Sequence, residues 1–409
     1  NNTAVGSAAL GSNTTGSENT AIGSFAGDAL TTGFSNTALG MKALSADTTG
    51  RYSVAIGHSA LENQAFTGNN NSYNTAVGYS AGNDITTGAQ NTLIGALAGD
   101  SITTANSNTA VGQAALTAST TGADNVAMGV NALGTTTTGA SNTSVGTNAL
   151  RYATTASNNT AVGRDALNAN TTGANNASFG MYSLTANTTA SRNAAFGYNA
   201  GSSITTGNEN VCLGHAAGNE LTVGSDNIVI GGDASSGDSG SNDRIVIGRN
   251  ATGTSNDRIT IGIAGNIAEL DLNGSDTSWA ASSDIRLKEN VQDSTAGLNF
   301  INDLRPVTFD WKKKKDIDES LENYYEENSE ERIHGKEGIT YHGFIAQETR
   351  EVIENHSEVA NGLGLIKDRD DGVLTAAPSA LIPVMTKAIQ ELSTQVDELK
   401  SELLALKGE

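Results

Sequence analysis

The 409-residue sequence has one cysteine, three prolines and only 5% aromatic residues. A single cysteine excludes an intrachain disulfide framework and a cysteine-based zinc finger. Because aromatic side chains supply much of an ordinary globular core, their scarcity argues against a large enzyme domain. No run of about 18 apolar residues is present, so we expect no membrane span. The net charge of −21 argues against nucleic acid and anionic membranes as partners.

Composition divides the chain near Trp279. Residues 1–278 contain 8 Lys and Arg, 18 Asp and Glu, no Pro and no Trp. Residues 279–409 contain 15 Lys and Arg, 26 Asp and Glu, both Trp and all three Pro. This shift in charge density predicts two domains of different kinds.

The first part is a repeat, in which a segment such as Asn159–Gly163 returns along the chain. Of the 15 intervals between its closing glycines, 13 equal the step from Gly146 to Gly163, one is longer and one is shorter. These glycines are Gly6, Gly23, Gly40, Gly57, Gly78, Gly95, Gly112, Gly129, Gly146, Gly163, Gly180, Gly197, Gly214, Gly231, Gly248 and Gly262. In a typical unit a second apolar pair, Ala-Leu or Ala-Gly, follows the glycine, and Thr-Thr-Gly stretches indicate turns.

Each unit predicts one coil of a parallel β-solenoid. Five residues rich in Thr, Val and Ile and closed by Gly are typical of a short strand, and the unit is too short for two helices. Equivalent positions would stack into ladders of Asn, of Ala and of Val or Ile. At about 4.8 Å per strand, 16 coils give a rod of roughly 75 Å. So thin a coil buries little apolar surface, and we expect several chains to associate laterally. The strict period disfavours the alternative of low-complexity disorder.

The strand segments of residues 1–262, such as Ser53–Gly57, resemble the β-roll heads of trimeric autotransporter adhesins. The coils of that family are shorter than the 17-residue period found here, which leaves handedness and coil shape open. We assign residues 1–232 to the repeats and 233–272 to capping repeats, because terminal repeats must be atypical. Residues 273–282 form a polar linker.

Four motifs in the last third of the chain occur in a fixed order. They are Ser282–Lys288, Leu304–Lys312, Tyr341–Glu348 and Ala377–Val384. Together they resemble the endosialidase-type intramolecular chaperone found at the ends of phage tail spikes and fibres, over residues 281–409. The resemblance implies a trimer that assists assembly of the preceding β-rod and then cuts itself off. It also implies Ser283 as nucleophile and Lys288 as general base, with cleavage between Ser282 and Ser283.

Ser283 and Lys288 can also serve as nucleophile and base on general chemical grounds, without the resemblance. A serine hydroxyl needs a base, and a lysine serves if burial or a cationic neighbour such as Arg286 lowers its pKa. Attack by Ser283 on its own preceding carbonyl would give an ester that water hydrolyses, and the intramolecular geometry favours it. The plain alternative makes Ser283 a linker residue and Lys288 a solvated charge. We assign residues 283–380 to this chaperone and autopeptidase domain.

Residues 381–409 predict a parallel coiled coil. Apolar residues alternate spacings of three and four over nearly four heptads. They are Ile382, Met385, Ile389, Leu392, Val396, Leu399, Leu403 and Leu406. The core residues alone favour a dimer, whereas both family resemblances imply a trimer, and we choose the trimer by that analogy.

Several other features have ordinary explanations. Lys312–Lys315 and the acidic stretch 316–331 indicate a solvated, partly disordered hairpin insertion. Asp368–Gly372 lacks the last ligand of a calcium loop and indicates a turn. Cys212 lies at a strand position and should be buried and inert. The five histidines show no ligand spacing, and we expect neither a cofactor nor a metal.

The leading hypothesis is a phage tail fibre, or a fibre of a related extracellular contractile particle. Its mainly β fold would be a trimeric solenoid rod followed by a small α+β chaperone domain, and single-turnover self-cleavage by a Ser-Lys serine peptidase would be its only catalysis. The chain begins at Asn1 without a leader, and we expect a fragment attached upstream to a tail or particle protein. A host-surface glycan or protein is the expected receptor. The alternative is a trimeric adhesin of the bacterial cell surface that retains its chaperone.

Overall fold

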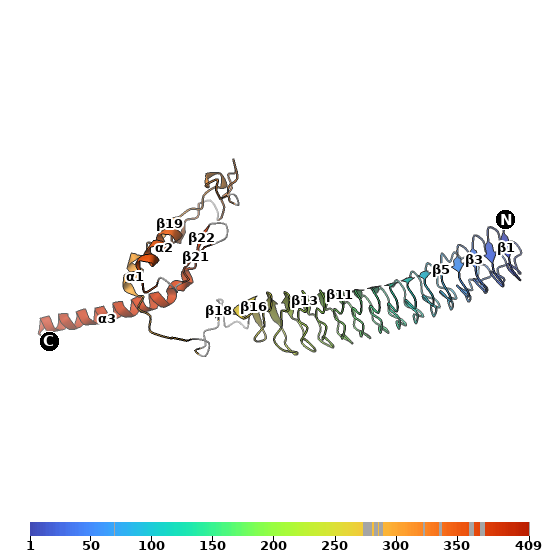
Figure 1. Ribbon diagram of the computed structural model, residues 1–409, viewed down its shortest axis with the longest axis horizontal. Coiled ribbons are helices and arrows are strands. Elements are labelled where there is room, and N and C mark those ends of the chain that lie inside the picture. Colours follow the sequence, from blue (N-terminus) through green and yellow to red (C-terminus); the bar gives the residue numbers. More distant parts are fainter. Residues whose placement is uncertain are drawn as a thin grey trace. The chain divides into compact units, whose positions relative to one another are not determined.

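The computed structural model describes residues 1–68, 70–272, 280–281, 285, 289–321, 324–334, 338–359, 364–368 and 373–408. It forms two compact units, residues 1–283 and residues 284–409, and each is considered by itself. Figure 1 shows the first as a stack of coils and the second as a mixed region that ends in a long helix. The chain is mainly β, as predicted.

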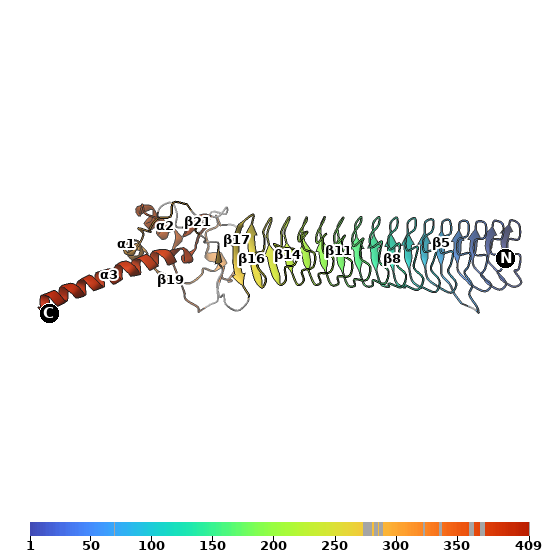
Figure 2. The ribbon, with the colours of Figure 1, turned by 90° about the horizontal axis from the view of Figure 1, so that it is seen from below.

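The first unit is a parallel β-solenoid. Strands β1 to β16 pair in parallel with their neighbours in the sequence, each with the strand of the next coil (Figure 2). Their bounds are β1 (Thr3–Val5), β2 (Thr20–Ile22), β3 (Thr37–Leu39), β4 (Val54–Ile56), β5 (Thr75–Val77), β6 (Thr92–Ile94), β7 (Thr109–Val111), β8 (Val126–Met128), β9 (Thr143–Val145), β10 (Thr160–Val162), β11 (Ala177–Phe179), β12 (Ala194–Phe196), β13 (Val211–Leu213), β14 (Ile228–Ile230), β15 (Arg244–Ile247) and β16 (Arg258–Ile263). The repeating segments therefore predicted both the strands and their register.

Most of these strands are three residues long rather than the five predicted. The closing glycine ends the strand, because its backbone leaves the extended region. Gly163, for example, has a φ of +133°, and a Cβ there would lie 2.6 Å from the backbone of Gly180 in the next coil. Only glycine combines this φ with so close an approach between coils.

The asparagine before each strand from β2 to β14, except β4, forms a buried ladder along the rod. In the middle of the rod, the Oδ1 atom of Asn142 accepts hydrogen bonds from the backbone N–H (3.0 Å) and the Nδ2 (3.2 Å) of Asn159. The Nδ2 of Asn142 donates to the carbonyl of Ala156 at 2.9 Å. Each side chain of the ladder thus satisfies backbone groups of neighbouring coils.

The apolar core is built from small side chains and, in the coils before Gly231, one large one per coil after the glycine. The middle residue of the strand, mostly Ala, points into the coil, as does the Ala three residues after the glycine. A large aliphatic residue follows at one of two positions. When Leu stands four residues after the glycine, a small or polar residue stands at the seventh, as in Leu133 and Thr136. When Gly stands at the fourth position, Leu or Ile fills the seventh, as in Gly27 and Leu30.

The one longer unit, between Gly57 and Gly78, replaces part of the asparagine ladder. Ser53 stands where other coils have Asn, and Gln64 supplies the missing amide. The Oε1 of Gln64 accepts from the Nδ2 of Asn74 at 2.9 Å, and its Nε2 donates to Ser53 Oγ at 2.8 Å and to Asp47 Oδ2 at 2.6 Å. Burial raises the pKa of the Asp47 carboxyl, although Gln64 and backbone N–H groups hydrogen-bond to it.

The solenoid ends in two strands that do not continue its parallel pairing. Strand β17 (Asn266–Asp271) pairs antiparallel with β16, and β18 (Ala280–Ala281) pairs antiparallel with β17. Arg258 on β16 forms ion pairs with Glu269 at 3.2 Å and Asp271 at 3.1 Å on β17. The two chain directions are therefore joined by charge as well as by backbone hydrogen bonds.

The second unit combines short helices with two small hairpins. Its elements are α1 (Leu298–Asp303), β19 (Val307–Phe309), the 3-10 helix η2 (Lys314–Asp316), β20 (Tyr341–Gly343), α2 (Ala346–Asn355), β21 (Ile366–Asp368), β22 (Leu374–Ala376), the 3-10 helix η3 (Pro378–Leu381) and α3 (Ile382–Lys407). Strands β21 and β22 pair antiparallel on either side of the predicted turn, residues 369–372 of which lie outside the described residues. A core of Ala296, Phe300, Leu304, Val359, Leu365, Leu381 and Val384 joins α1, η3 and α3, and residues of α2 and β21 pack against it.

Candidate functional site

The predicted catalytic pair and the predicted cleavage bond lie outside the described residues. Residues 282–284 and 286–288 are not described, so Ser282, Ser283, Arg286 and Lys288 receive no structural account. The assignment of nucleophile and base stays a prediction from the sequence. The described part of the C-terminal unit shows how the other three motifs are arranged.

Two of these motifs are strands of one hairpin. Strand β19, from the motif Leu304–Lys312, pairs antiparallel with β20, from the motif Tyr341–Glu348, so that Thr308 lies opposite His342. The ring of Phe309 on β19 lies 6.1 Å from that of Tyr341 on β20. The motifs lie well apart in the sequence, and the fold makes them a single element.

A charged pair joins the same two motifs beside the hairpin. The guanidinium of Arg305 contacts both carboxylate oxygens of Glu348 on α2, through Nε at 2.9 Å and through Nη2 at 2.5 Å. The bidentate hydrogen bonds lower the pKa of Glu348 and raise that of Arg305. Both side chains are substantially exposed, so the pair fixes orientation more than it stabilises the fold.

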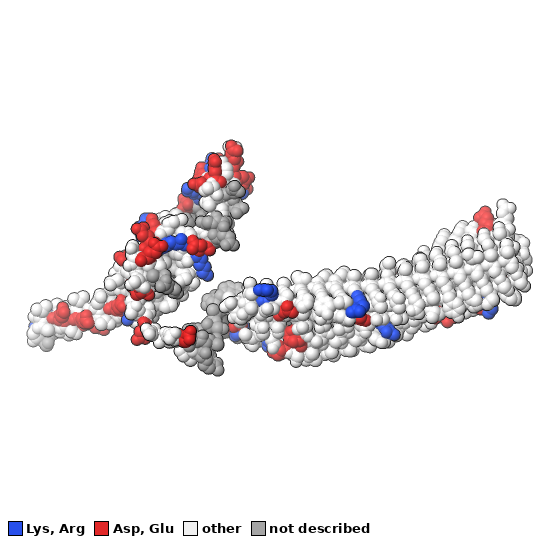
Figure 3. Space-filling model, viewed as in Figure 1, with Lys and Arg blue, Asp and Glu red and all other residues white. Residues whose placement is uncertain are grey.

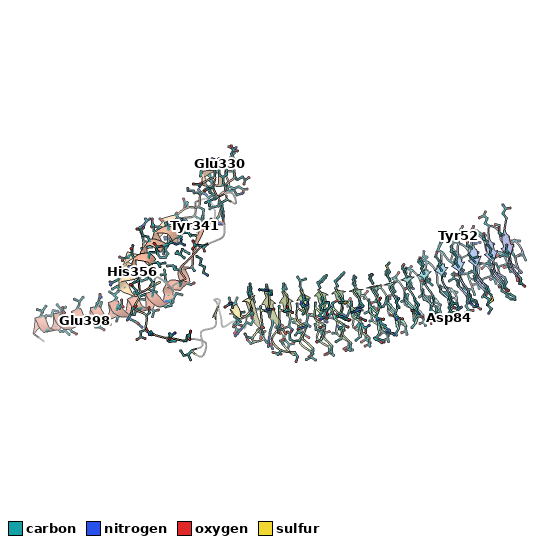
Figure 4. All side chains as sticks on the ribbon, in the orientation of Figure 1. Tyr52, Asp84, Glu330, Tyr341, His356 and Glu398 are labelled. Carbon is teal, nitrogen blue, oxygen red and sulfur yellow. The ribbon has the colours of Figure 1, made fainter. Side chains whose placement is uncertain are left out.

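His356 is the residue at this surface that the sequence did not single out. Its Nδ1 lies 2.8 Å from Glu358 Oε1 and its Nε2 lies 2.8 Å from Asp303 Oδ2. The hydrogen bond to Glu358 and then that to Asp303 raise the pKa of His356. Figure 4 shows the labelled His356 among the short helices of the unit. The local His-Ser-Glu sequence hinted at Glu358, but Asp303 lies far away in the sequence, on α1.

A shallow hollow of about 400 Å³ adjoins these groups. Asp303, Arg305, Glu348 and His356 contribute to its lining together with residues of α2. Both signs of charge are present, and Arg305, Glu348, Asp303 and His356 are paired with one another as described above. Within the described ranges, no three His, Cys, Asp or Glu side chains are grouped closely enough to hold a metal ion.

Residues of the fourth motif, Ala377–Val384, lie in the hydrophobic core of the C-terminal unit. Leu381 of η3 and Val384 of α3 are buried with Phe300 and Leu304. The carboxylate of Glu391 on α3 accepts the backbone N–H of Leu298 at 2.8 Å and so satisfies the N-terminus of α1. A Cβ on Gly297 would lie 2.3 Å from this carboxylate, so a larger residue there would displace the Glu391 side chain.

Helix α3 has the predicted heptad pattern, and the seam is on its exposed side. Ile382, Ile389 and Leu399 are 62%, 65% and 63% exposed, whereas Val384 and Ala388 face the core of the unit. The seam residues, from Ile382 to Leu406, therefore do not form the core of this chain. Among the described helices none is long and apolar enough to cross a bilayer.

The charged insertion is a folded-back arm. Lys313 and Lys315 both pair with Glu330, and Lys314 pairs with Glu326 at 2.8 Å and Glu331 at 2.9 Å. Figure 4 shows Glu330 at the far end of this segment from His356. An antiparallel bridge joins Lys313 to Arg332, as in a hairpin. The lysines pair with three of the eight acidic residues of the stretch 316–331.

Cys212 is buried within the solenoid, as expected. Burial raises the pKa of its thiol to about 12, so the reactive thiolate is scarce at neutral pH. Ser144 and Ser178 occupy the equivalent positions in β9 and β11, which indicates a packing role for Cys212.

Comparison with known proteins agrees with the architecture of the C-terminal unit. No curated protein matches the chain. Residues 283–358 match the protein family described as chaperone of endosialidase. The match covers the first three motifs, including the β19–β20 hairpin, the Arg305–Glu348 pair and His356. The chain therefore combines a β-solenoid with a C-terminal segment that is similar to an intramolecular chaperone.

Proposed function

We propose that the chain is a trimeric β-solenoid fibre whose C-terminal unit assembles the rod and then releases itself by cleavage between Ser282 and Ser283. The observation that carries this proposal is the family match, which begins at Ser283, at the C-terminal boundary of the rod unit. A chaperone placed directly after a repetitive rod is positioned to start its assembly.

The rod has a physical need for such a device. Its coils are nearly identical, so two chains displaced by one coil would lose only the contacts at the ends. Folding that depends on pairing between many coils is slow and exposed to aggregation. The exposed seam of α3 would join three chains at one end and fix their mutual register before the coils stack.

The cleavage step needs only groups of this chain. The Oγ of Ser283 attacks the carbonyl carbon of Ser282 while Lys288, as a neutral amine, accepts the hydroxyl proton. The C–N bond then breaks, the amine of Ser283 takes up a proton, and an ester links Ser282 to Ser283 Oγ. Water hydrolyses this ester to a carboxyl at Ser282 and a free hydroxyl at Ser283. Proximity makes the attack effectively unimolecular.

Release would change the stability of the product from thermodynamic to kinetic. Once the α3 seam has been cleaved off, dissociation of α3 can no longer start the separation of the three chains at the C-terminal end of the rod. Its lifetime would then depend on the barrier to opening a stack of coils. A chaperone that is cut off would therefore leave a kinetically stable rod, which a permanently attached domain would not do.

We place the fibre in a phage tail or a related extracellular particle, because the C-terminal segment is similar to a chaperone of endosialidase. The partners would be a tail or particle protein upstream and a host-surface glycan or protein as receptor. The alternative is a surface adhesin that has the same rod, is not cleaved and keeps its chaperone.

Intact mass spectrometry of the freshly expressed chain tests the proposal. We expect two fragments that divide before Ser283 in the wild type and in the matched control Ser282→Ala. Ser283→Ala and Lys288→Ala should each give one uncut chain. A single uncut wild-type chain would remove the peptidase and favour the adhesin, and cleavage that persists in Ser283→Ala would overturn the assigned nucleophile.

A further inference from the structure

The outer face of the strand ladder is apolar along the whole solenoid. In every strand from β1 to β16 the residue just before the closing glycine points outward and is large and apolar, and none is buried within the chain. These residues are Val5, Ile22, Leu39, Ile56, Val77, Ile94, Val111, Met128, Val145, Val162, Phe179, Phe196, Leu213, Ile230, Ile247 and Ile261. We call this surface, with the outward residue two positions earlier in each strand, the outer strand face.

The outer strand face becomes more apolar toward its C-terminal end. From β1 to β10 the earlier outward residue is Thr, except for Val54 and Val126. From β11 to β16 it is apolar throughout, and these residues are Ala177, Ala194, Val211, Ile228, Ile245 and Ile259. The rings of Phe179 and Phe196 stack here, with centroids 4.8 Å apart. None of the outward positions in the sixteen strands holds a charge. Figure 3 shows scattered charged side chains on the side of the rod in view, most of them toward its C-terminal end.

We propose that the outer strand face is where copies of this chain contact one another, and that β11–β16 form the strongest part of the contact. The inference rests on the proposed trimer and says which surface of the rod makes it. A row of aliphatic side chains that repeats with every strand is matched in spacing by the same row on another copy. It offers no charge and few polar groups to any other kind of partner.

The size of the face fits this partner. Three residues per strand at about 3.3 Å and sixteen strands at about 4.8 Å give a strip of roughly 750 Å². A standard protein interface buries about 800 Å² on each side. Apolar patches of this extent are rarely left in contact with water.

The exposed seam of α3 points to the same occupant. It is a second unpartnered apolar surface in the same chain, and its heptad pattern calls for further helices of the same kind. Copies joined there in parallel would bring together first the coils that are nearest to α3 in the sequence, β11–β16. The direction of the apolar gradient therefore agrees with assembly that begins at the C-terminal end of the rod.

Cysteine cross-linking of the full chain tests the contact. In a Cys212→Ser background, Ile230→Cys should be joined into covalent oligomers by a short bis-maleimide. The matched control Asn219→Cys, exposed elsewhere on a neighbouring coil, should stay uncross-linked. Equal cross-linking at both positions, or none at Ile230→Cys in an assembled chain, would overturn the proposal.

Charge substitution tests the gradient. Ile230→Asp should lower the yield of assembled rod at least tenfold, Val77→Asp at most about threefold, and Asn219→Asp not measurably, each scored by sedimentation. Equal effects of Ile230→Asp and Asn219→Asp would overturn the contact. If Ile230→Asp leaves assembly intact but abolishes binding to a glycan array, the outer strand face belongs to a glycan instead.

The proposed trimer and the proposed contact through the outer strand face can be disproved separately. If the Ser283→Ala chain sediments as a monomer, the proposed trimer is wrong and the outer strand face loses its partner. If that chain is trimeric, and Ile389→Asp in α3 disrupts the trimer while Ile230→Asp does not, the chaperone proposal stands and the contact proposed here is wrong.

Discussion

At the scale of single residues, the large aliphatic side chain of a coil stands at either the fourth or the seventh position after the closing glycine. This alternation keeps the cross-section of the solenoid constant. A Cβ added to Gly27 would lie 3.0 Å from Leu30 Cδ1 and 3.2 Å from Leu10 Cδ2. The side chain of Leu30 thus occupies the space that a Leu at position 27 would need. Position 27 already has a φ of +55°, close to the φ of Leu44 at the equivalent position of the next coil, +54°.

This exchange predicts a strong coupling between the two positions. Gly27→Leu alone should overpack the coil and cost about 1–3 kcal/mol. Leu30→Asn alone should cost about 2–5 kcal/mol, because it removes buried apolar volume. The double variant recreates the arrangement of Leu167 and Asn170, and we expect it to regain most of the loss, with a coupling energy of at least about 2 kcal/mol. Urea unfolding of the four proteins measures it, and additive losses would contradict the exchange.

The titration of His356 gives a prediction for the C-terminal unit. Its pKa is raised in the folded state, so the charged ring stabilises the unit fully below its ordinary pKa of about 6.5. That stabilisation is lost as the pH rises through the folded-state pKa. We expect His356→Gln to lower the melting temperature more at pH 5.5 than at pH 9.

In a Trp279→Phe background, fluorescence of Trp311 follows the unfolding of this unit, since Trp311 is then the one tryptophan of the chain. His342→Gln, on the exposed side of β20, is the matched control and should show no such pH dependence. A His356→Gln effect that is the same at both pH values would contradict the assigned role of Asp303 and Glu358.

At the scale of elements, the asparagine ladder holds the strands in register. Asn142→Ala would leave the buried N–H of Asn159 and the carbonyl of Ala156 without their partners. Each unsatisfied group costs about 1–3 kcal/mol, so we expect a loss of about 2 kcal/mol or more. Hydrogen exchange at the amide of Asn159 should become faster, whereas exposed Asn219→Ala should leave it unchanged. Unaltered protection in Asn142→Ala would show that the backbone alone sets the register.

The sequence predicted elements whose contacts recur at a constant spacing. All sixteen glycine-closed segments are strands, because each strand residue pairs with its copy one period further along the chain. The sequence did not predict that Gln64 replaces an asparagine of the ladder, since that contact arises only in the one irregular coil. Nor did it predict Asp303 beside His356, because only the fold brings these distant residues together. The roles of Ser283 and Lys288 remain predictions.

At the scale of the whole molecule, the two units differ in what they need from other copies. The solenoid satisfies its backbone through neighbouring coils but leaves its outer strand face apolar. The C-terminal unit has its own core and leaves the α3 seam apolar. Both exposed surfaces are explained if several chains assemble in parallel, with α3 setting the register and the solenoids following.

The most direct test of this account is a refolding measurement. The uncleaved Ser283→Ala chain and the rod released from the wild type are unfolded in guanidinium chloride and diluted, and the recovered rod is quantified by sedimentation. We predict that the Ser283→Ala chain regains assembled rod and that the released rod recovers at least tenfold less. Equal recovery of the two proteins would contradict an intramolecular chaperone.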